Sequence, residues 1–132
     1  MQPKTTLTIA SIIGLIFSSA MFLAPEFVTR EQFPNSEGQG FADLVTLRYA
    51  IASLILALVI ISYHLRDITG HAFQIHVMRG YTLAFGVVCI TNLALQLTGK
   101  ISAVPPIVGT GVIAVLSLLT WRSVVSRTKE EA

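Results

Sequence analysis

Long stretches of the chain contain only apolar and small polar residues, and the charged residues gather between them. Three stretches have no Asp, Glu, Lys, Arg or His, namely residues 5–25, 81–99 and 101–121. A helix needs about 20 largely apolar residues to cross about 30 Å of hydrocarbon at about 1.5 Å per residue. Each of the three stretches is long enough, so each is predicted to be a transmembrane helix.

A fourth apolar stretch is shorter. Tyr49–Tyr63, between Arg48 and His64, has fifteen residues and makes a helix of roughly 22 Å. To span the bilayer this helix must extend past Arg48 to about Leu44. The sequence therefore predicts an all-α integral membrane bundle of four transmembrane helices in one domain, residues 1–132. The expected spans are about 5–24, 44–63, 80–97 and 104–121.

The breaks between the apolar stretches give the connections. Pro25 is expected to end the first helix, and Pro105 with Pro106 suits the first turn of the fourth. The third and fourth helices are predicted to be antiparallel neighbours because residues 98–103 make a short connection. Residues 26–43 are rich in Pro, Gly, Asn and Ser, and predict an irregular exposed loop.

The composition agrees with a membrane protein and excludes several other classes. The chain has 132 residues, of which 53% are hydrophobic and 12% charged, whereas a soluble domain carries about 25% charged residues. This composition excludes a disordered tail, a basic nucleic-acid-binding module and an ordinary cytosolic enzyme. A single cysteine, Cys89, excludes a disulfide framework and a cysteine-rich zinc site.

The positions of the basic residues predict the topology. Six Lys and Arg residues would lie on one side of the membrane and three on the other, which favours cytoplasmic termini. The six are Lys4, Arg66, Arg79, Arg122, Arg127 and Lys129, and the three are Arg30, Arg48 and Lys100. One alternative stays open, because residues 1–20 also resemble a cleaved signal peptide. Cleavage would leave three helices and the same cytoplasmic C-terminus.

Arg48 is the strongest candidate for a functional residue, because an ionised side chain at the centre of a span costs about 2.5 kcal/mol or more. It is expected about 6 Å inside the outer end of its helix. Asn92, Gln96 and Thr110 are expected in the same outer layer, with Glu26 at its mouth. These residues predict a shallow pocket, open outward, that holds a polar headgroup, a quinone oxygen or a carboxylate.

A purely structural interpretation of the same residues stays open beside the pocket. In it Arg48 extends to the membrane surface, while Asn92 and Thr110 join helices by hydrogen bonds. Independently of this choice, Arg48 is placed to hydrogen-bond Asn92 or Gln96 and to pair with Glu26 or Asp43 at the mouth. Small residues recur every fourth position at Ala10, Gly14 and Ser18 (a spacing that allows helices to approach closely). Packing inside the bundle is the expected use of that spacing.

Histidines and catalytic motifs offer little further chemistry. His64 and His76 flank the second and third expected helices, whereas the ligands of a haem buried between helices must project inside the bundle. We therefore expect no metal and no cofactor. The alternatives are a metal ion or a haem with His64 and His76 as ligands, or a bound quinone. The chain has no G-x-S-x-G, H-E-x-x-H or phosphate-binding loop motif.

Some short features are shared with a known family. Leu23-Ala24-Pro25 ends the first apolar stretch, Asp43 and Arg48 open the second, and Arg79-Gly80 opens the third. With the long loop after Pro25, this layout resembles the DoxX-like group of small bacterial four-helix membrane proteins. The resemblance implies a compact bundle in the bacterial inner membrane, sometimes linked to quinone-dependent oxidation or to partner proteins.

These observations predict a class of function rather than an activity. The first hypothesis is a non-enzymatic accessory, assembly or partner-binding subunit. The second is a membrane redox subunit associated with quinone or haem. The third is a protein that binds an external lipid or amphiphile in a polar pocket of the outer leaflet. Expected partners are the lipid bilayer and other membrane proteins or further copies of the chain, but not nucleic acid.

Overall fold

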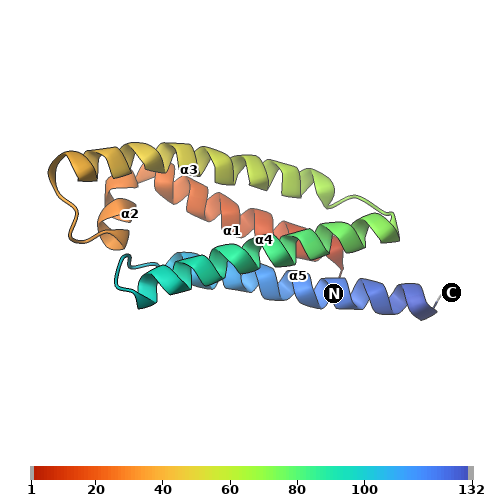
Figure 1. The fold of residues 1–132 in the computed structure, drawn as a ribbon. Helices are drawn as coiled ribbons and strands as arrows, with labels where there is room; N and C mark the ends of the chain where they lie inside the picture. The colour runs from red at the N-terminus through yellow and green to blue at the C-terminus, as the bar shows by residue number, and fades with distance from the viewer. Residues whose placement is uncertain (1, 131–132) are drawn as a thin grey trace.

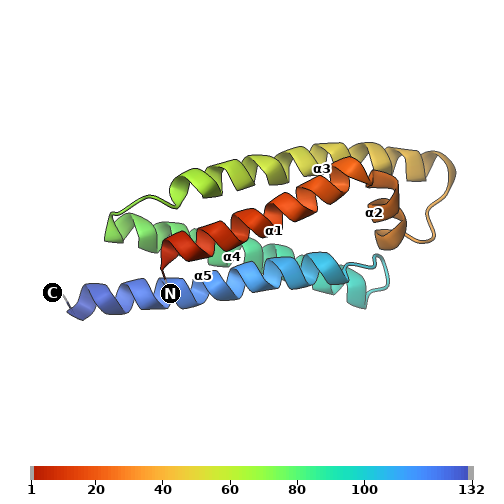
Figure 2. The same ribbon diagram turned by 180° about the vertical axis from the view of Figure 1, so that it is seen from behind.

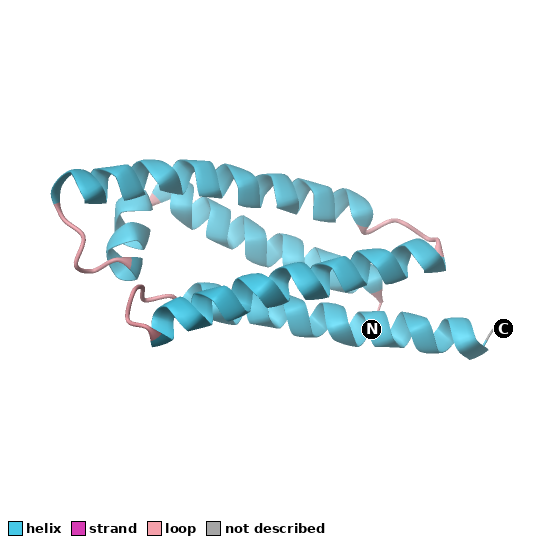
Figure 3. Cartoon of the chain, in the orientation of Figure 1, coloured by secondary structure: helices cyan, strands magenta, loops and turns pink. Residues whose placement is uncertain are grey.

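The computed structural model describes residues 2–130, and helices are the regular secondary structure in this range. Figure 3 shows helices joined by loops, with no strand in this range. The helices are α1 (Pro3–Leu23), α2 (Pro25–Gln32), α3 (Gly38–Leu65), α4 (His71–Leu97) and α5 (Val104–Glu130). By length and composition, the four long helices can each cross a membrane. The all-α class and the four long apolar helices are thus confirmed.

The long helices form two antiparallel pairs (Figures 1 and 2). α1 packs against α3, α4 packs against α5, and α1 against α5 joins the two pairs. Within residues 2–130, α3 and α4 do not pack against each other along their length. The ring of four helices is therefore closed on three sides. The expected pairing of the third and fourth apolar helices is confirmed by α4 and α5.

The two ends of the bundle differ. The short helix α2 and the connection between α4 and α5 lie at one end, which we call the α2 end. The termini and the connection between α3 and α4 lie toward the opposite end, which we call the terminus end (Figure 2). The position of a residue along its helix therefore shows whether it lies toward the α2 end or toward the terminus end.

Proline and glycine set several helix boundaries. α1 ends at Leu23 and α2 starts at Pro25, whose fixed φ suits the first position of a helix. Pro105 and Pro106 lie in the first turn of α5, as predicted. α4 ends before Gly99, which has a φ of +69° and so occupies the left-handed region that glycine enters at little cost.

The predicted irregular loop over residues 26–43 is wrong. Pro25–Gln32 form α2, and α3 begins at Gly38, so only residues 33–37 connect them. An eight-residue helix is marginal in isolation and depends on tertiary packing. Here that packing comes from Thr29, which is fully buried. On the other side, α4 already begins at His71, nine residues before the expected start of its span.

The outer surface of the helices is apolar and the protein-covered core is small. Leu54, Ile90 and Leu97 are 68%, 68% and 79% exposed to the surroundings of the chain. Leu7 and Met78 are among the few large side chains that are fully buried. Such a surface is unfavourable in water and suits hydrocarbon, because lipid tails are as apolar as leucine. Together with the four long helices, it describes an integral membrane protein.

Hydroxyl groups link the helices at both ends of α1. Ser18 Oγ donates a hydrogen bond to the carbonyl of Ala52 in α3 at 2.9 Å. The hydroxyls of Thr6 and Thr120 are 2.5 Å apart and join α1 to α5. Both links are buried, so they hold α1 against its two neighbours where water cannot compete.

Close approach of α1 and α3 depends on Gly14. A Cβ at this position would lie 2.6 Å from Val59 Cγ2, which is well inside van der Waals contact. Valine in a helix has one strongly preferred χ1 rotamer, so Val59 cannot easily turn away. Gly14, the middle residue of the Ala10, Gly14, Ser18 series, therefore allows α1 and α3 to pack closely inside the bundle.

Gly14→Ala is expected to destabilise the bundle by about 1–3 kcal/mol, because the added methyl group overpacks the α1–α3 contact. The matched control is Gly86→Ala, since Gly86 is also helical but has no neighbouring atom within 4 Å of the place that an added methyl group would take. The control should keep or slightly raise stability, as alanine favours helix. Unfolding of both variants in detergent micelles, followed by circular dichroism, measures the difference. Equal stabilities would contradict the close approach.

An exposed ion pair joins α1 to the α3–α4 connection at the terminus end. Lys4 Nζ lies 3.0 Å from Asp67 Oδ1, and Arg66 Nε lies 3.5 Å from Oδ2 of the same carboxylate. The hydrogen bond from Lys4, aided by the charges of Lys4 and Arg66, holds the pKa of Asp67 below its ordinary value. The ionised form of Asp67 therefore favours the folded state.

Asp67→Asn is expected to lower the melting temperature slightly near pH 7. The stabilisation by a carboxylate with a lowered folded-state pKa is present above its unfolded pKa, about 3.9, and is lost as the pH falls through the folded value. The difference between wild type and Asp67→Asn should therefore shrink progressively as the pH falls below the unfolded pKa. In a Lys4→Gln background the effect of Asp67→Asn at pH 7 should shrink. An effect independent of both pH and Lys4 would contradict the pairing.

Candidate functional site

A cavity of about 320 Å³ lies between the two helix pairs. It runs along the bundle from Arg48 near the α2 end to Ser62 in α3, which is roughly 21 Å of helix. All four long helices contribute to its walls, and α2 contributes Gln32. Its apolar lining includes Ile13, Phe17, Met21, Ile51, Ile55, Leu58, Val59, Phe85, Val88 and Ile113. The volume is at the lower end of the range of about 300–1,000 Å³ that is typical of small-ligand pockets.

Arg48 provides the charge of this cavity. Its residue is only 5% exposed, and its Nε donates a hydrogen bond to Thr29 Oγ1 at 3.3 Å. The guanidinium carbon lies 5.4 Å from the centre of the Phe33 ring, within the range of a cation–π contact. Nη2 is buried and has no hydrogen-bond partner among residues 2–130. Arg48 thus lines the cavity, and part of the hydrogen-bonding capacity of its buried guanidinium group is unused.

Helix α2 positions the partner of Arg48. Thr29 donates its own hydroxyl hydrogen to the carbonyl of Pro25 at 2.7 Å, so its oxygen remains an acceptor for Arg48. The carbonyl of Gln32, at the end of α2, accepts a hydrogen bond from the backbone N–H of Ser102 at 2.9 Å. This bond ties α2 to the α4–α5 connection. α2 therefore covers the polar end of the cavity and is held from two sides.

Thr29 and Phe33 were not among the residues expected at the site, since their whole segment was predicted to be a loop. A usable signal was present in Pro25 followed by Glu26, because proline and an acidic residue are typical of a first helical turn. Nothing in the spacing of the residues indicated that Thr29 would meet Arg48.

Asn92 and Thr110 line the same cavity as Arg48. The Asn92 amide nitrogen donates to the carbonyl of Val88 at 2.9 Å, one turn earlier in α4. Thr110 Oγ1 donates to the carbonyl of Pro106 at 2.6 Å. Because each group is bonded only through its hydrogen atoms, the Asn92 carbonyl and the Thr110 oxygen keep acceptor capacity. These two residues and Arg48, from three helices, share one polar region.

The other two candidate residues have different places. Gln96 Oε1 accepts a hydrogen bond from the backbone N–H of Ala103 at 3.2 Å and so supports the α4–α5 connection. Glu26 is exposed in the first turn of α2. Within residues 2–130, Arg48 forms no ion pair with Glu26 or Asp43. The expected pairing is therefore wrong, because α2 places the hydroxyl of Thr29 against Arg48 instead of a carboxylate.

The two histidines named as alternative ligands lie outside the cavity. His64 and His76 are both exposed, and His64 Nδ1 lies 2.8 Å from the carbonyl of Ile60 in its own helix. Among the described residues, no three His, Cys, Asp or Glu side chains gather where they could hold a metal ion.

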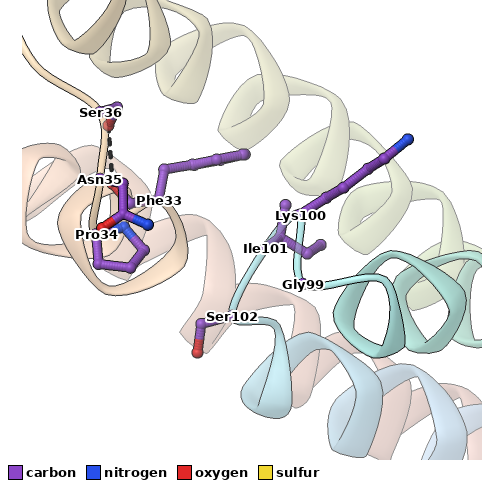
Figure 4. A pocket seen from close by; sticks show the side chains of 8 residues that line it. All are labelled: Phe33, Pro34, Asn35, Ser36, Gly99, Lys100, Ile101 and Ser102. Atoms are coloured by element: carbon purple, nitrogen blue, oxygen red, sulfur yellow. Dashed lines mark hydrogen bonds between the residues drawn. The ribbon is translucent and has the colours of Figure 1, made fainter.

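A second hollow, of about 340 Å³, lies at the α2 end between two connections. Figure 4 shows that it is formed by residues 33–36, after α2, and 99–102, before α5. The Lys100 side chain points away from Asn35 and Ser36, which lie across the hollow. Phe33 lines this hollow and also contacts Arg48. The one charged side chain of its described lining, Lys100, therefore does not point toward the residues across the hollow.

The electrostatics of the cavity follow from one guanidinium group. Arginine stays protonated in proteins, so burial cannot neutralise it. A buried cation without a counter-ion is costly, and a hydroxyl and an aromatic ring compensate only part of that cost. The arrangement can therefore bind an oxygen-bearing polar group at Arg48 while the apolar walls hold a hydrocarbon portion.

Comparisons with known proteins give no assignment: no family model, no curated protein and no solved structure matches this chain.

Thr29→Val is expected to destabilise the bundle by about 1–3 kcal/mol, because it removes the hydrogen-bond acceptor of a buried charge while keeping the shape of the side chain. The control is Thr46→Val, since Thr46 is exposed in α3 and bonds only to the carbonyl of Ala42 in its own helix. Denaturant-induced unfolding in micelles compares the two variants. An equal loss in both would show that Arg48 does not depend on Thr29.

Proposed function

We propose that this chain is a non-enzymatic integral membrane protein that binds an amphiphilic molecule inside its bundle, with the polar head of the ligand at Arg48. The observation that carries the proposal is Arg48, a buried residue with an unpartnered Nη2 that lines a predominantly apolar cavity of about 320 Å³. A ligand oxygen would supply the missing hydrogen bond, and the apolar walls would cover its hydrocarbon part.

The distribution of polar groups supports an amphiphile rather than a uniformly polar ligand. Arg48, Asn92, Thr110 and Gln32 line the α2 end of the cavity, whereas most of the remaining lining is apolar. α3 and α4 do not pack along their length and are joined toward the terminus end by the Ser62–Tyr81 hydrogen bond. The part of this side nearer the α2 end offers a path from surrounding lipid into the cavity. A molecule already dissolved in the bilayer could then enter without crossing water.

The proposal includes a topology with both termini in the cytoplasm of a bacterial inner membrane. Five basic residues near the terminus end support it by the positive-inside rule, namely Lys4, Arg66, Arg79, Arg122 and Arg127. The segment that includes α2 contains the acidic residues Glu26, Glu31, Glu37 and Asp43. The resemblance to DoxX-like proteins supports the bacterial location.

Other roles fit within the same proposal or compete with it. Amphiphile binding suits an accessory or partner-binding subunit whose ligand or lipid-facing helices contact another membrane protein. A quinone is the competing ligand, because Arg48 can donate a hydrogen bond to a quinone oxygen. The contents of the purified protein distinguish these ligands.

Protein extracted in mild detergent is expected to carry a co-purifying amphiphile that Arg48→Gln loses. The control is Arg30→Gln, since Arg30 is also near the α2 end but is exposed and stacks on Phe41 outside the cavity. Mass spectrometry of a solvent extract identifies and quantifies the ligand, and an ultraviolet spectrum reveals a quinone. We expect about tenfold less ligand in Arg48→Gln, the equivalent of about 1.4 kcal/mol, and no change in Arg30→Gln.

A second pair of variants tests the cavity without touching the charge. Val88 lines the cavity, whereas its neighbour Val87 is 64% exposed and lies outside the lining. Val88→Phe should fill the cavity and lower the ligand content, while Val87→Phe should leave it unchanged. If the wild type carries no amphiphile, or if all four variants carry as much as the wild type, the proposal is wrong.

A further inference from the structure

We infer that the ligand of this cavity is a single-chain amphiphile with a monoanionic head, a long-chain carboxylate, whose carboxylate pairs with Arg48. The inference rests on the proposed function and specifies the class of ligand. The chain of the carboxylate would run along the cavity toward Ser62 at the terminus end.

The charge of the head follows from the charged residues of the cavity. Among its described lining residues, Arg48 alone is ionisable, and no Asp or Glu lies beside it as a counter-ion. A neutral head would satisfy the free N–H groups but would leave the buried charge uncompensated. A carboxylate supplies both an opposite charge and two acceptor oxygens in the geometry that a guanidinium group prefers.

The number of cations favours a head with one negative charge. Phosphate sites in proteins draw on several N–H donors or cations, because a phosphate group carries up to two charges and several oxygens. Here one guanidinium group is the only cation of the described lining, the Thr110 hydroxyl already donates to a backbone carbonyl, and one of the two amide N–H groups of Asn92 does the same. A second negative charge would therefore lie in the apolar cavity without a partner.

The shape of the cavity favours one hydrocarbon chain. About 320 Å³ is spread along roughly 21 Å of helix, so the space is long and narrow. A lipid with two chains would need a wider space over the same length. At the far end, Ser62 bonds to the carbonyl of Leu58 and to the Tyr81 hydroxyl, so its polar group is already satisfied. The far end of the cavity suits a methyl terminus rather than a second polar group.

The test compares three ligands that share the chain length and differ in the head, together with a quinone that has a shorter chain. Delipidated protein in neutral micelles is titrated with palmitate, hexadecanol, hexadecyl phosphate and decylubiquinone, and dissociation constants are measured by calorimetry. Palmitate is expected to bind about 10- to 100-fold more tightly than hexadecanol, because charge-assisted hydrogen bonds are stronger than neutral ones. Palmitate should also bind more tightly than hexadecyl phosphate and decylubiquinone.

Variants assign the preference to one residue. In Arg48→Gln, palmitate and hexadecanol should bind about equally tightly. Arg30→Gln should keep the preference for palmitate. Val88→Phe should weaken both ligands, and Val87→Phe neither. If Arg48→Gln does not fold, two results still test the inference. These are the preference of the wild type for palmitate and the weaker binding of palmitate to Val88→Phe.

Each contrary outcome identifies what has failed. Equal binding of palmitate and hexadecanol, both weakened by Val88→Phe, would overturn the monoanionic head and leave amphiphile binding standing. Tighter binding of decylubiquinone or of hexadecyl phosphate would overturn the carboxylate in favour of a quinone or a dianion. If Val88→Phe weakens no ligand, the proposed function itself is wrong.

Discussion

The guanidinium group of Arg48 is the constraint on which the α2 end of the bundle depends. Its charge cannot be removed by proton loss, so the fold must supply partners at a depth where water is scarce. The structure supplies a hydroxyl group from Thr29 and the face of the Phe33 ring. Both lie on the segment between α1 and α3, which explains why this segment folds back over the bundle instead of extending away from it.

This dependence gives α2 a physical reason to exist. Eight residues do not form a stable helix alone, yet Pro25 starts the helix and the buried Thr29 anchors it at Arg48. The backbone bond from Ser102 to Gln32 then connects α2 with the second helix pair. The two pairs are thus joined by α1 against α5 along the bundle, by α2 at one end and by the Ser62–Tyr81 hydrogen bond toward the other, and the cavity remains between them.

The parts of this architecture that the sequence predicted are those governed by local composition. Charge-free stretches of about 20 residues identify spans because hydrocarbon penalises every charge and every unpaired backbone group. The prolines predicted where α1 ends and where α5 begins, because a proline restricts the backbone at its own position. The segment after Pro25 was predicted wrongly, because its helix depends on a contact between Thr29 and Arg48, which lies nineteen residues later in the chain. Likewise, acidic residues near Arg48 suggested an ion pair, and only the fold shows that a hydroxyl takes that place.

An unpartnered buried polar atom does not by itself indicate a binding site, as Ser117 shows. Its Oγ is also buried without a partner among residues 2–130, but the residue is fully buried in α5 and does not line the cavity. An unsatisfied neutral hydroxyl group costs less than an unpartnered charge, and Ser117 lies outside the cavity lining. Arg48 differs in charge and in position, because its unused donor belongs to a permanent cation beside an apolar space. The combination of fixed charge and open volume, rather than either one, distinguishes a site for an amphiphile from an imperfection of packing.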